Sequence, residues 1–145
     1  MTEKIDNLIN TATQAVELKS KYQDYQAGVC NIGAGEREKR RELAIFGGMF
    51  ASAWPFLGFV FVFPIGFKLL VLIPAFIGML NLLQYRQQFC AYFGLTNQYK
   101  FSDTLRPYKV MHEDDRAIDQ DKSLKMIAIS LAVSFVYTLL VIIFF

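Results

Sequence analysis

The sequence predicts an all-α membrane protein with three transmembrane helices, at about residues 43–63, 69–85 and 126–145. Lys68 is the only charged residue between positions 43 and 85, and no charged side chain occurs from position 126 onward. A helix of about 20 apolar residues crosses the hydrocarbon core of a bilayer. A soluble domain of 145 residues cannot bury two apolar blocks of this length, so a membrane location follows.

Length and charge limit the other possibilities. The 145 residues allow one domain, whose parts are residues 1–42, 43–85, 86–125 and 126–145. The 15 basic residues are interleaved with 13 acidic ones and the net charge is +2, so we expect no nucleic-acid partner. The start of the chain does not resemble a secretory signal peptide, and we expect the first span to act as the insertion signal.

The first segment, residues 3–27, is predicted to form an amphipathic helix because apolar side chains recur at helical spacing. These are Ile5, Leu8, Ile9, Ala12, Ala15 and Val16. Such a helix either lies on the membrane surface or packs against protein, and its near-neutral charge favours protein packing. Gly28, Gly33 and Gly35 end this helix, and a polar helix of mixed charge is expected from Ala34 into the membrane.

Small residues in the first span predict a close approach of another helix. The patch consists of Gly47, Gly48, Ala51 and Ser52. Pro55 removes one backbone donor further along this span and predicts a kink. A tight turn at residues 64–68 then leads to the second span, which contains a lone polar side chain, Asn81. A re-entrant hairpin is the alternative to two spans, although the first segment alone is long enough to cross.

The chain after the hairpin is predicted to return to the membrane through polar structure. Residues 86–110 are expected to form an aromatic-rich loop along the headgroup layer. Residues 112–125 are expected to form a cytoplasmic charged helix that runs directly into the third span. Its acidic and basic residues are spaced for pairing as Glu113–Arg116, Asp119–Lys122 and Asp121–Lys125.

The third span carries a stripe of hydroxyl side chains every four residues, at Ser130, Ser134 and Thr138. We interpret this stripe, together with Gly47 and Gly48, as a surface on which helices dock. The alternative is that each hydroxyl bonds only to the carbonyl four residues before it.

The basic residues predict the orientation of the chain. Seven Lys or Arg residues precede the first span and seven lie between Arg86 and Lys125, whereas the turn between the first two spans has one. The positive-inside rule then places the N-terminus and the long polar segment in the cytoplasm. With three spans, the C-terminus lies on the outer side.

Few residues in the sequence offer chemistry. Cys30, Cys90 and the only histidine, His112, could in principle share a zinc ion, and the two cysteines could form a redox pair. The spacing supports neither, so packing is the favoured interpretation of both cysteines. Asn81 either lines a polar path or bonds to a neighbouring helix, and we favour the bond. No Asp, Glu, Arg or His lies inside a predicted span, which argues against a proton-coupled transporter.

Two segments together carry a resemblance. Cys30-Asn31-Ile32-Gly33 precedes the hydrophobic hairpin, and Phe89-Cys90-Ala91-Tyr92-Phe93-Gly94 follows it. This arrangement resembles small uncharacterised bacterial membrane proteins, and the similarity covers residues 28–145. The resemblance implies a bacterial protein in which the two cysteine segments lie near each other, and it implies no activity.

The sequence therefore predicts a non-enzymatic accessory, scaffolding or assembly subunit in the bacterial plasma membrane. Its expected partners are membrane lipid and either other membrane subunits or further copies of the chain, and no cofactor is expected. One alternative is a small homo-oligomeric channel or a transporter of lipids or small molecules, with a path around Asn81. A weaker alternative is a thiol or metal site at the cytoplasmic interface.

Overall fold

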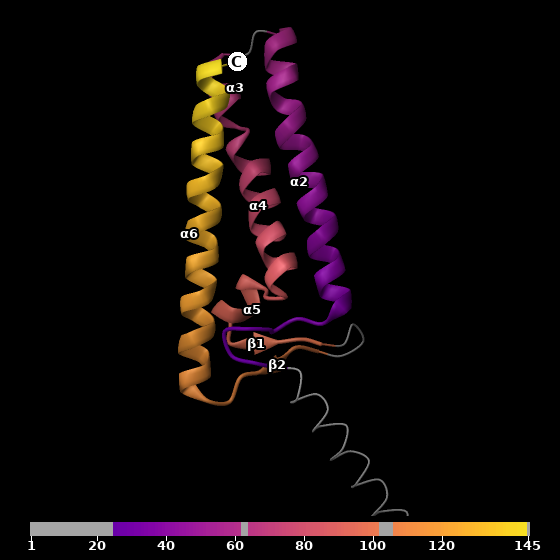
Figure 1. Cartoon of the computed structure of the whole chain (residues 1–145), viewed down its shortest axis with the longest axis vertical. Coiled ribbons are helices and arrows are strands. Elements are labelled where there is room, and N and C mark those ends of the chain that lie inside the picture. Colours follow the sequence, from indigo (N-terminus) through magenta and orange to yellow (C-terminus); the bar gives the residue numbers. More distant parts are fainter. Residues whose placement is uncertain (1–24, 62–63, 102–105, 145) are drawn as a thin grey trace, which may run out of the picture.

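The computed structural model describes residues 25–61, 64–101 and 106–144 of the chain, and it is mostly helical. Within these residues three long helices run side by side, namely α2 (Ala34–Phe61), α4 (Leu72–Gln87) and α6 (Glu113–Phe144) (Figure 1). Two short helices accompany them, α3 (Ile65–Leu69) and α5 (Ala91–Leu95). The predicted N-terminal amphipathic helix falls on residues 1–24, apart from its last three positions, and these 24 residues lie outside the described part of the chain.

The described helices confirm the predicted membrane class. Three segments are long and apolar enough to cross a membrane by length and composition: Ala34–Phe61, Ile65–Gln87 and Glu113–Phe144. Large side chains cover their outer faces, and Phe46, Phe50 and Phe59 are each more than half exposed. Such a surface is unfavourable in water and suits contact with lipid tails. A multi-pass membrane protein follows.

Proline explains how the second membrane segment departs from its predicted bounds. Residues 65–69 form α3, with Pro64 at its N-cap, instead of a tight turn. The helix then breaks at Leu70 and Val71 before α4 begins at Leu72. Pro74, in the first turn of α4, has no N–H for the carbonyl of Leu70, and its ring clashes with a helical turn before it. The break therefore lies one turn before the proline.

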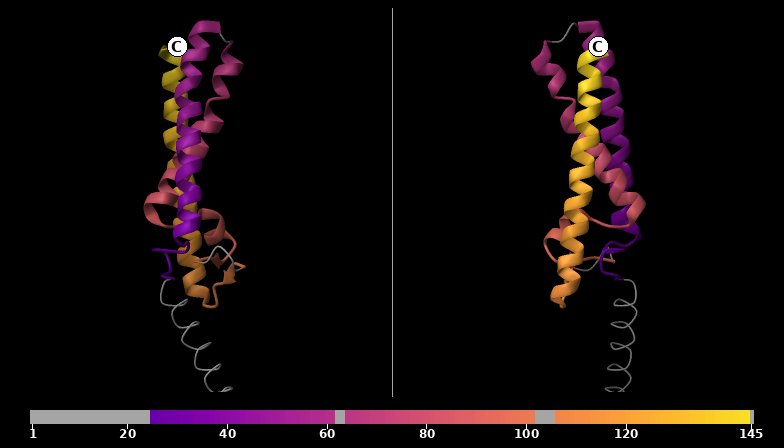
Figure 2. Two further views of the ribbon diagram at one scale, coloured as in Figure 1. Left: turned by 90° about the vertical axis from the view of Figure 1, so that its right-hand side faces the viewer. Right: turned by 60° about the vertical axis from the view of Figure 1, so that its left-hand side comes forward.

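The predicted loop at residues 86–110 is a compact structure. It contains α5 and two antiparallel strands, β1 (Gln98–Tyr99) and β2 (Tyr108–Lys109), so the chain is not wholly α-helical. The aromatic side chains are divided between two environments: Phe89 and Tyr99 are buried, whereas Tyr92 is exposed. Because α5 packs against α6, half of this aromatic segment forms a small core beside the helices. The strands and α3 lie at opposite ends of the bundle (Figures 1 and 2).

Helix α4 packs against both α2 and α6, and the predicted small residues make the first of these contacts (Figure 2). A Cβ atom added to Gly47 would lie 2.5 Å from the backbone nitrogen of Gly78, so the two backbones are in direct contact. A Cβ atom added to Gly48 would have no atom within 4 Å. The predicted glycine patch is therefore divided, with Gly47 inside the helix pair and Gly48 beside it.

The hydroxyl stripe of α6 is buried within the chain. Ser130, Ser134 and Thr138 are at most 2% exposed, and each donates a hydrogen bond to the carbonyl four residues earlier. The hydroxyls are satisfied by their own helix, and the narrow face that they create is a packing surface against the other spans.

Candidate functional site at the polar end of the bundle

The two cysteine segments meet at the end of the bundle where α2 and α6 begin. We call this end the polar cap and define it as residues 25–33, 88–101 and 106–112. The Asn31 side chain donates from Nδ2 to the carbonyl of Cys90 (3.0 Å), and its Oδ1 accepts from the Cys90 N–H (2.6 Å). Asn31 is fully buried and serves as the bridge between the segments. The proximity implied by the resemblance is present, through Asn31 and not through the thiols.

The two thiols have separate surroundings. Cys30 Sγ lies 3.5 Å from the carbonyl oxygen of Ile32 and 3.9 Å from Oε1 of Gln88. Cys90 is fully buried, and its sulfur accepts from Nη2 of Arg40 at 3.3 Å. Within residues 25–61, 64–101 and 106–144, no group of three His, Cys, Asp or Glu side chains is placed to hold a metal ion. His112 is exposed at the start of α6 and forms no such group.

A charged network joins α2 to the polar cap. Glu36 accepts from Lys39 (3.1 Å) in its own helix and from Lys100 (3.2 Å) in the cap. One turn further along α2, Nη1 of Arg40 lies 3.5 Å from Oδ1 of Asn81. Asn81 also donates to the carbonyl of Ile77 (2.8 Å). The Asn81 amide therefore has a partner in its own helix and another in α2.

Two buried polar atoms remain near this network. Gln84 is 3% exposed, and its Oε1 has no hydrogen-bond partner in the described part of the chain. The same holds for Nε of Arg40.

Asp119 holds the start of the described chain against α6. This carboxylate is fully buried, and it accepts from the N–H of Gly28 (2.7 Å) and from the hydroxyl of Tyr25 (2.8 Å). Burial and the bond to Asp119 raise the pKa of Tyr25, so the phenol keeps its proton. Lys122 adds a bond to the carbonyl of Val29 (3.2 Å). Gly28 has a positive φ of 66°, which favours glycine at this turn.

The predicted ion pairs of the charged helix are only partly formed. Lys125 and Asp121 pair at 2.5 Å, as predicted. Asp119 and Lys122 use their side chains to hold residues 25–29. Arg116 donates to the carbonyls of Val110 (2.8 Å) and Met111 (3.3 Å). The prediction missed these bonds because helical spacing identifies neighbours along one helix and contains no information on segments that fold over it.

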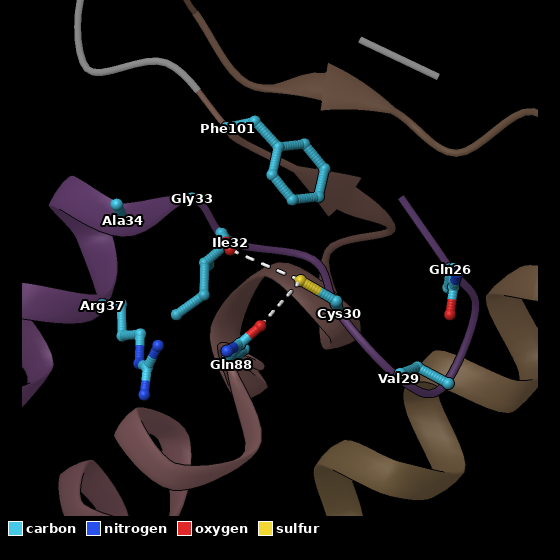
Figure 3. Close-up of a pocket in the computed structure, with 9 residues that line it drawn as sticks. All are labelled: Gln26, Val29, Cys30, Ile32, Gly33, Ala34, Arg37, Gln88 and Phe101. Atoms are coloured by element: carbon cyan, nitrogen blue, oxygen red, sulfur yellow. Dashed lines mark hydrogen bonds between the residues drawn. The ribbon is translucent and has the colours of Figure 1, made fainter. Parts of the chain in front are cut away.

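A pocket of about 580 Å³ opens beside Cys30, and we call it the rim pocket (Figure 3). Its lining includes Gln26, Cys30, Gly33, Arg37, Gln88 and Phe101. Arg37 is the only charged side chain that the described part of the chain contributes to the lining. Its Nε donates to the carbonyl of Tyr85 (3.2 Å), and its guanidinium lies 4.8 Å from the centre of the Tyr85 ring. The arginine is therefore fixed at the side of the pocket.

A second hollow lies among the three long helices. This groove has a volume of about 250 Å³ and is lined by residues of α2, α4 and α6. Ala44, Gly48 and Ser52 of α2 form one wall, and Val133 and Tyr137 of α6 form another. Because Gly48 and Ser52 are exposed, the groove opens to the outside of the bundle. Its surface is mostly apolar, and the Ser52 hydroxyl is satisfied by the carbonyl of Gly48 (2.8 Å).

Comparison with protein-family models, curated protein sequences and solved structures finds no match to this chain. The arrangement of its own residues is therefore the basis for a functional proposal. That arrangement offers a fixed cation beside a polar pocket and an open groove of small residues among membrane helices.

Proposed function

We propose that this protein is a non-enzymatic accessory or assembly subunit of a complex in the bacterial plasma membrane, with its polar cap in the cytoplasm. The observation that carries the proposal is the open groove beside α2. The occupant that we assign to it is a transmembrane helix of a different polypeptide.

The shape of α2 supports this occupant. Ala44, Gly48 and Ser52 follow one another at intervals of four residues and line the groove. Small residues at this spacing let the backbone of a second helix approach closely, and the contact is stabilised by van der Waals packing. The glycine that the chain uses for its own packing is Gly47, whereas Gly48 has open space in front of it. Helix α2 therefore has a second packing face that the described residues of the chain leave open.

The groove also suits a helix chemically. Ser52, the polar side chain on the α2 wall, already bonds to the carbonyl of Gly48, so an apolar helix leaves no hydroxyl without a partner there. The side chains that would move aside are those at the edges, such as Val133, which is 44% exposed.

Native mass spectrometry of the full chain, extracted from its own membrane in mild detergent, tests the proposal. The wild-type protein is expected to carry a different polypeptide at fixed stoichiometry. Gly48→Leu should fold normally, because the space at Gly48 is open, and should release that polypeptide by filling the groove. Ala53→Leu is the matched control, since Ala53 is exposed on α2 and lies outside the groove lining.

Two results would contradict the proposal. One is a wild-type mass made only of copies of this chain, in which case solute flux through the purified oligomer would favour the channel or transporter alternative. The other is loss of the partner from Ala53→Leu as complete as from Gly48→Leu. That result would place the contact elsewhere on α2.

A further inference from the structure

We propose that the rim pocket binds a phosphate group, carried either by a lipid headgroup or by a soluble phosphate ester. This site is separate from the groove of the proposed function, and neither proposal depends on the other. The argument begins with the cavity, whose volume of about 580 Å³ accommodates a phosphate with its substituents. Gln26, Ala34 and Gln88 on its rim are exposed, so the pocket is accessible.

Arg37 supplies a cation that is already positioned. Its Nε–H is occupied by the Tyr85 carbonyl, and its guanidinium lies over the Tyr85 ring. Its other N–H groups make no hydrogen bond within the part of the chain that the structure describes. A guanidinium held on one edge and open on the other is suited to bidentate binding of a phosphate. Because the side chain is already ordered, less entropy is lost on binding.

The charges around the pocket favour an anion. Among residues 25–61, 64–101 and 106–144, no acidic side chain lines it. The two nearest acids along α2 are paired with cations, Glu36 with Lys39 and Lys100, and Glu38 with Arg41. The described residues of the lining therefore present the positive charge of Arg37 without a compensating negative charge among them. The amides of Gln26 and Gln88 add neutral hydrogen-bond donors at the rim.

The beginning of α2 adds backbone donors to the same pocket. The first hydrogen bond within the helix joins the N–H of Arg37 to the carbonyl of Gly33 (3.0 Å), so the N–H groups of residues 34–36 precede it. A side chain at the N-cap usually satisfies such groups. That position is Gly33, where a Cβ atom would overlap the carbonyl of Phe101. The close approach of Phe101 thus excludes a capping side chain at position 33, and N–H groups at the start of a helix are suited to binding an anion.

The position of the pocket fits a ligand at the membrane boundary. Arg37 precedes Leu43, the start of the apolar run, by six residues, which corresponds to about 9 Å along a helix. Headgroups extend about 5–8 Å beyond the hydrocarbon core on each side. Arg37 therefore lies near the outer edge of the headgroup layer, where both a lipid phosphate and a soluble phosphate can reach it.

Two probes applied to the full-length protein distinguish these sources. The first is native mass spectrometry from nanodiscs of phosphatidylcholine with and without phosphatidylglycerol, which reports retained anionic lipid. The second is calorimetric titration with glycerol phosphate in non-ionic detergent. Retention of phosphatidylglycerol alone assigns the site to a lipid, and binding of glycerol phosphate alone assigns it to a soluble ester. Binding of both supports the shared phosphate chemistry.

Variants identify the pocket as the binding site. Arg37→Gln is expected to weaken the binding of whichever probe is bound by about tenfold or more, because a charge-assisted bidentate pair is lost. Gln88→Glu keeps the size of an exposed rim side chain and should weaken binding similarly by repelling the anion. If Arg37→Gln destabilises the fold, Gln88→Glu still tests whether the pocket is the binding site. Arg41→Gln is the matched control, since Arg41 lies one turn further along α2 and pairs with Glu38 outside the pocket.

The inference is overturned if neither probe binds, or if both pocket variants bind like the wild type. It is also overturned if Arg41→Gln weakens binding as much as Arg37→Gln, since the attraction would then be a general effect of basic residues. Circular dichroism of each variant confirms that the helices are retained.

Discussion

Tyr137 compensates for a proline in another helix. Pro55 has no N–H, so the carbonyl of Ala51, four residues earlier, lacks its usual partner inside α2. The hydroxyl of Tyr137 in α6 donates to this carbonyl at 2.9 Å. In a bilayer no water is available to replace that bond. We therefore expect Tyr137→Phe to lower the free energy of unfolding by about 1 kcal/mol, measured by denaturing titration in mixed micelles.

A double-mutant cycle separates this bond from general packing. Pro55→Ala restores an N–H that can reach the carbonyl of Ala51 within the helix. Tyr137→Phe should then cost much less in the Pro55→Ala background than in the wild type, and the difference is the coupling between the two positions. Equal costs in both backgrounds would show that the Tyr137 hydroxyl contributes nothing through Ala51.

At the scale of helices, the packing of α2 depends on two adjacent glycines, Gly47 and Gly48, which have opposite surroundings. A Cβ atom at Gly47 would meet backbone atoms of Gly78, which cannot move without separating α2 from α4. Gly47→Ala should therefore destabilise the fold by about 1–3 kcal/mol. Gly48→Ala should be close to neutral or slightly stabilising, because Cβ meets no atom and alanine favours helices. The fluorescence of Trp54, the only tryptophan, reports unfolding for both variants. Equal losses of stability would contradict the division of the glycine patch.

The long helices were predictable from sequence, whereas the short elements were not. Apolar runs without charge identify membrane spans because a bilayer imposes a minimum length on each one. Helix α5 and the strand pair have no such external constraint. Gly94 of α5 illustrates the difference, since a Cβ atom there would overlap the side chain of Ser123 in α6. Position 94 requires glycine because of a contact between segments that are far apart in the sequence. Neither segment alone contains a pattern that predicts this contact.

At the scale of the whole molecule, long-range bonds hold the polar cap together and fasten it to the bundle. Asn31 binds Cys90 within the cap, whereas Glu36 of α2 binds Lys100 and Asp119 of α6 binds Gly28. Each connects residues that are at least 59 positions apart in the sequence. The sequence predicted that the cysteine segments meet, through a resemblance, but it contained no sign of the Asp119 connection or of the rim pocket. The pocket lining comes from separate segments and exists only once these connections are made.

The two cysteines, placed at the same end of the bundle with different burial, test both the orientation and the packing of the polar cap. Cys30 is partly exposed and Cys90 is fully buried. A membrane-impermeant maleimide should label the native protein once, at Cys30, and only from the cytoplasmic side, as the distribution of basic residues predicts. Cys30→Ser should remove this labelling, and denaturant should then expose Cys90. Labelling from the outer side of intact cells would reverse the predicted orientation. Rapid labelling of native Cys30→Ser would show that the cap opens, because a thiol beneath the Asn31 bridge reacts only when that bridge separates.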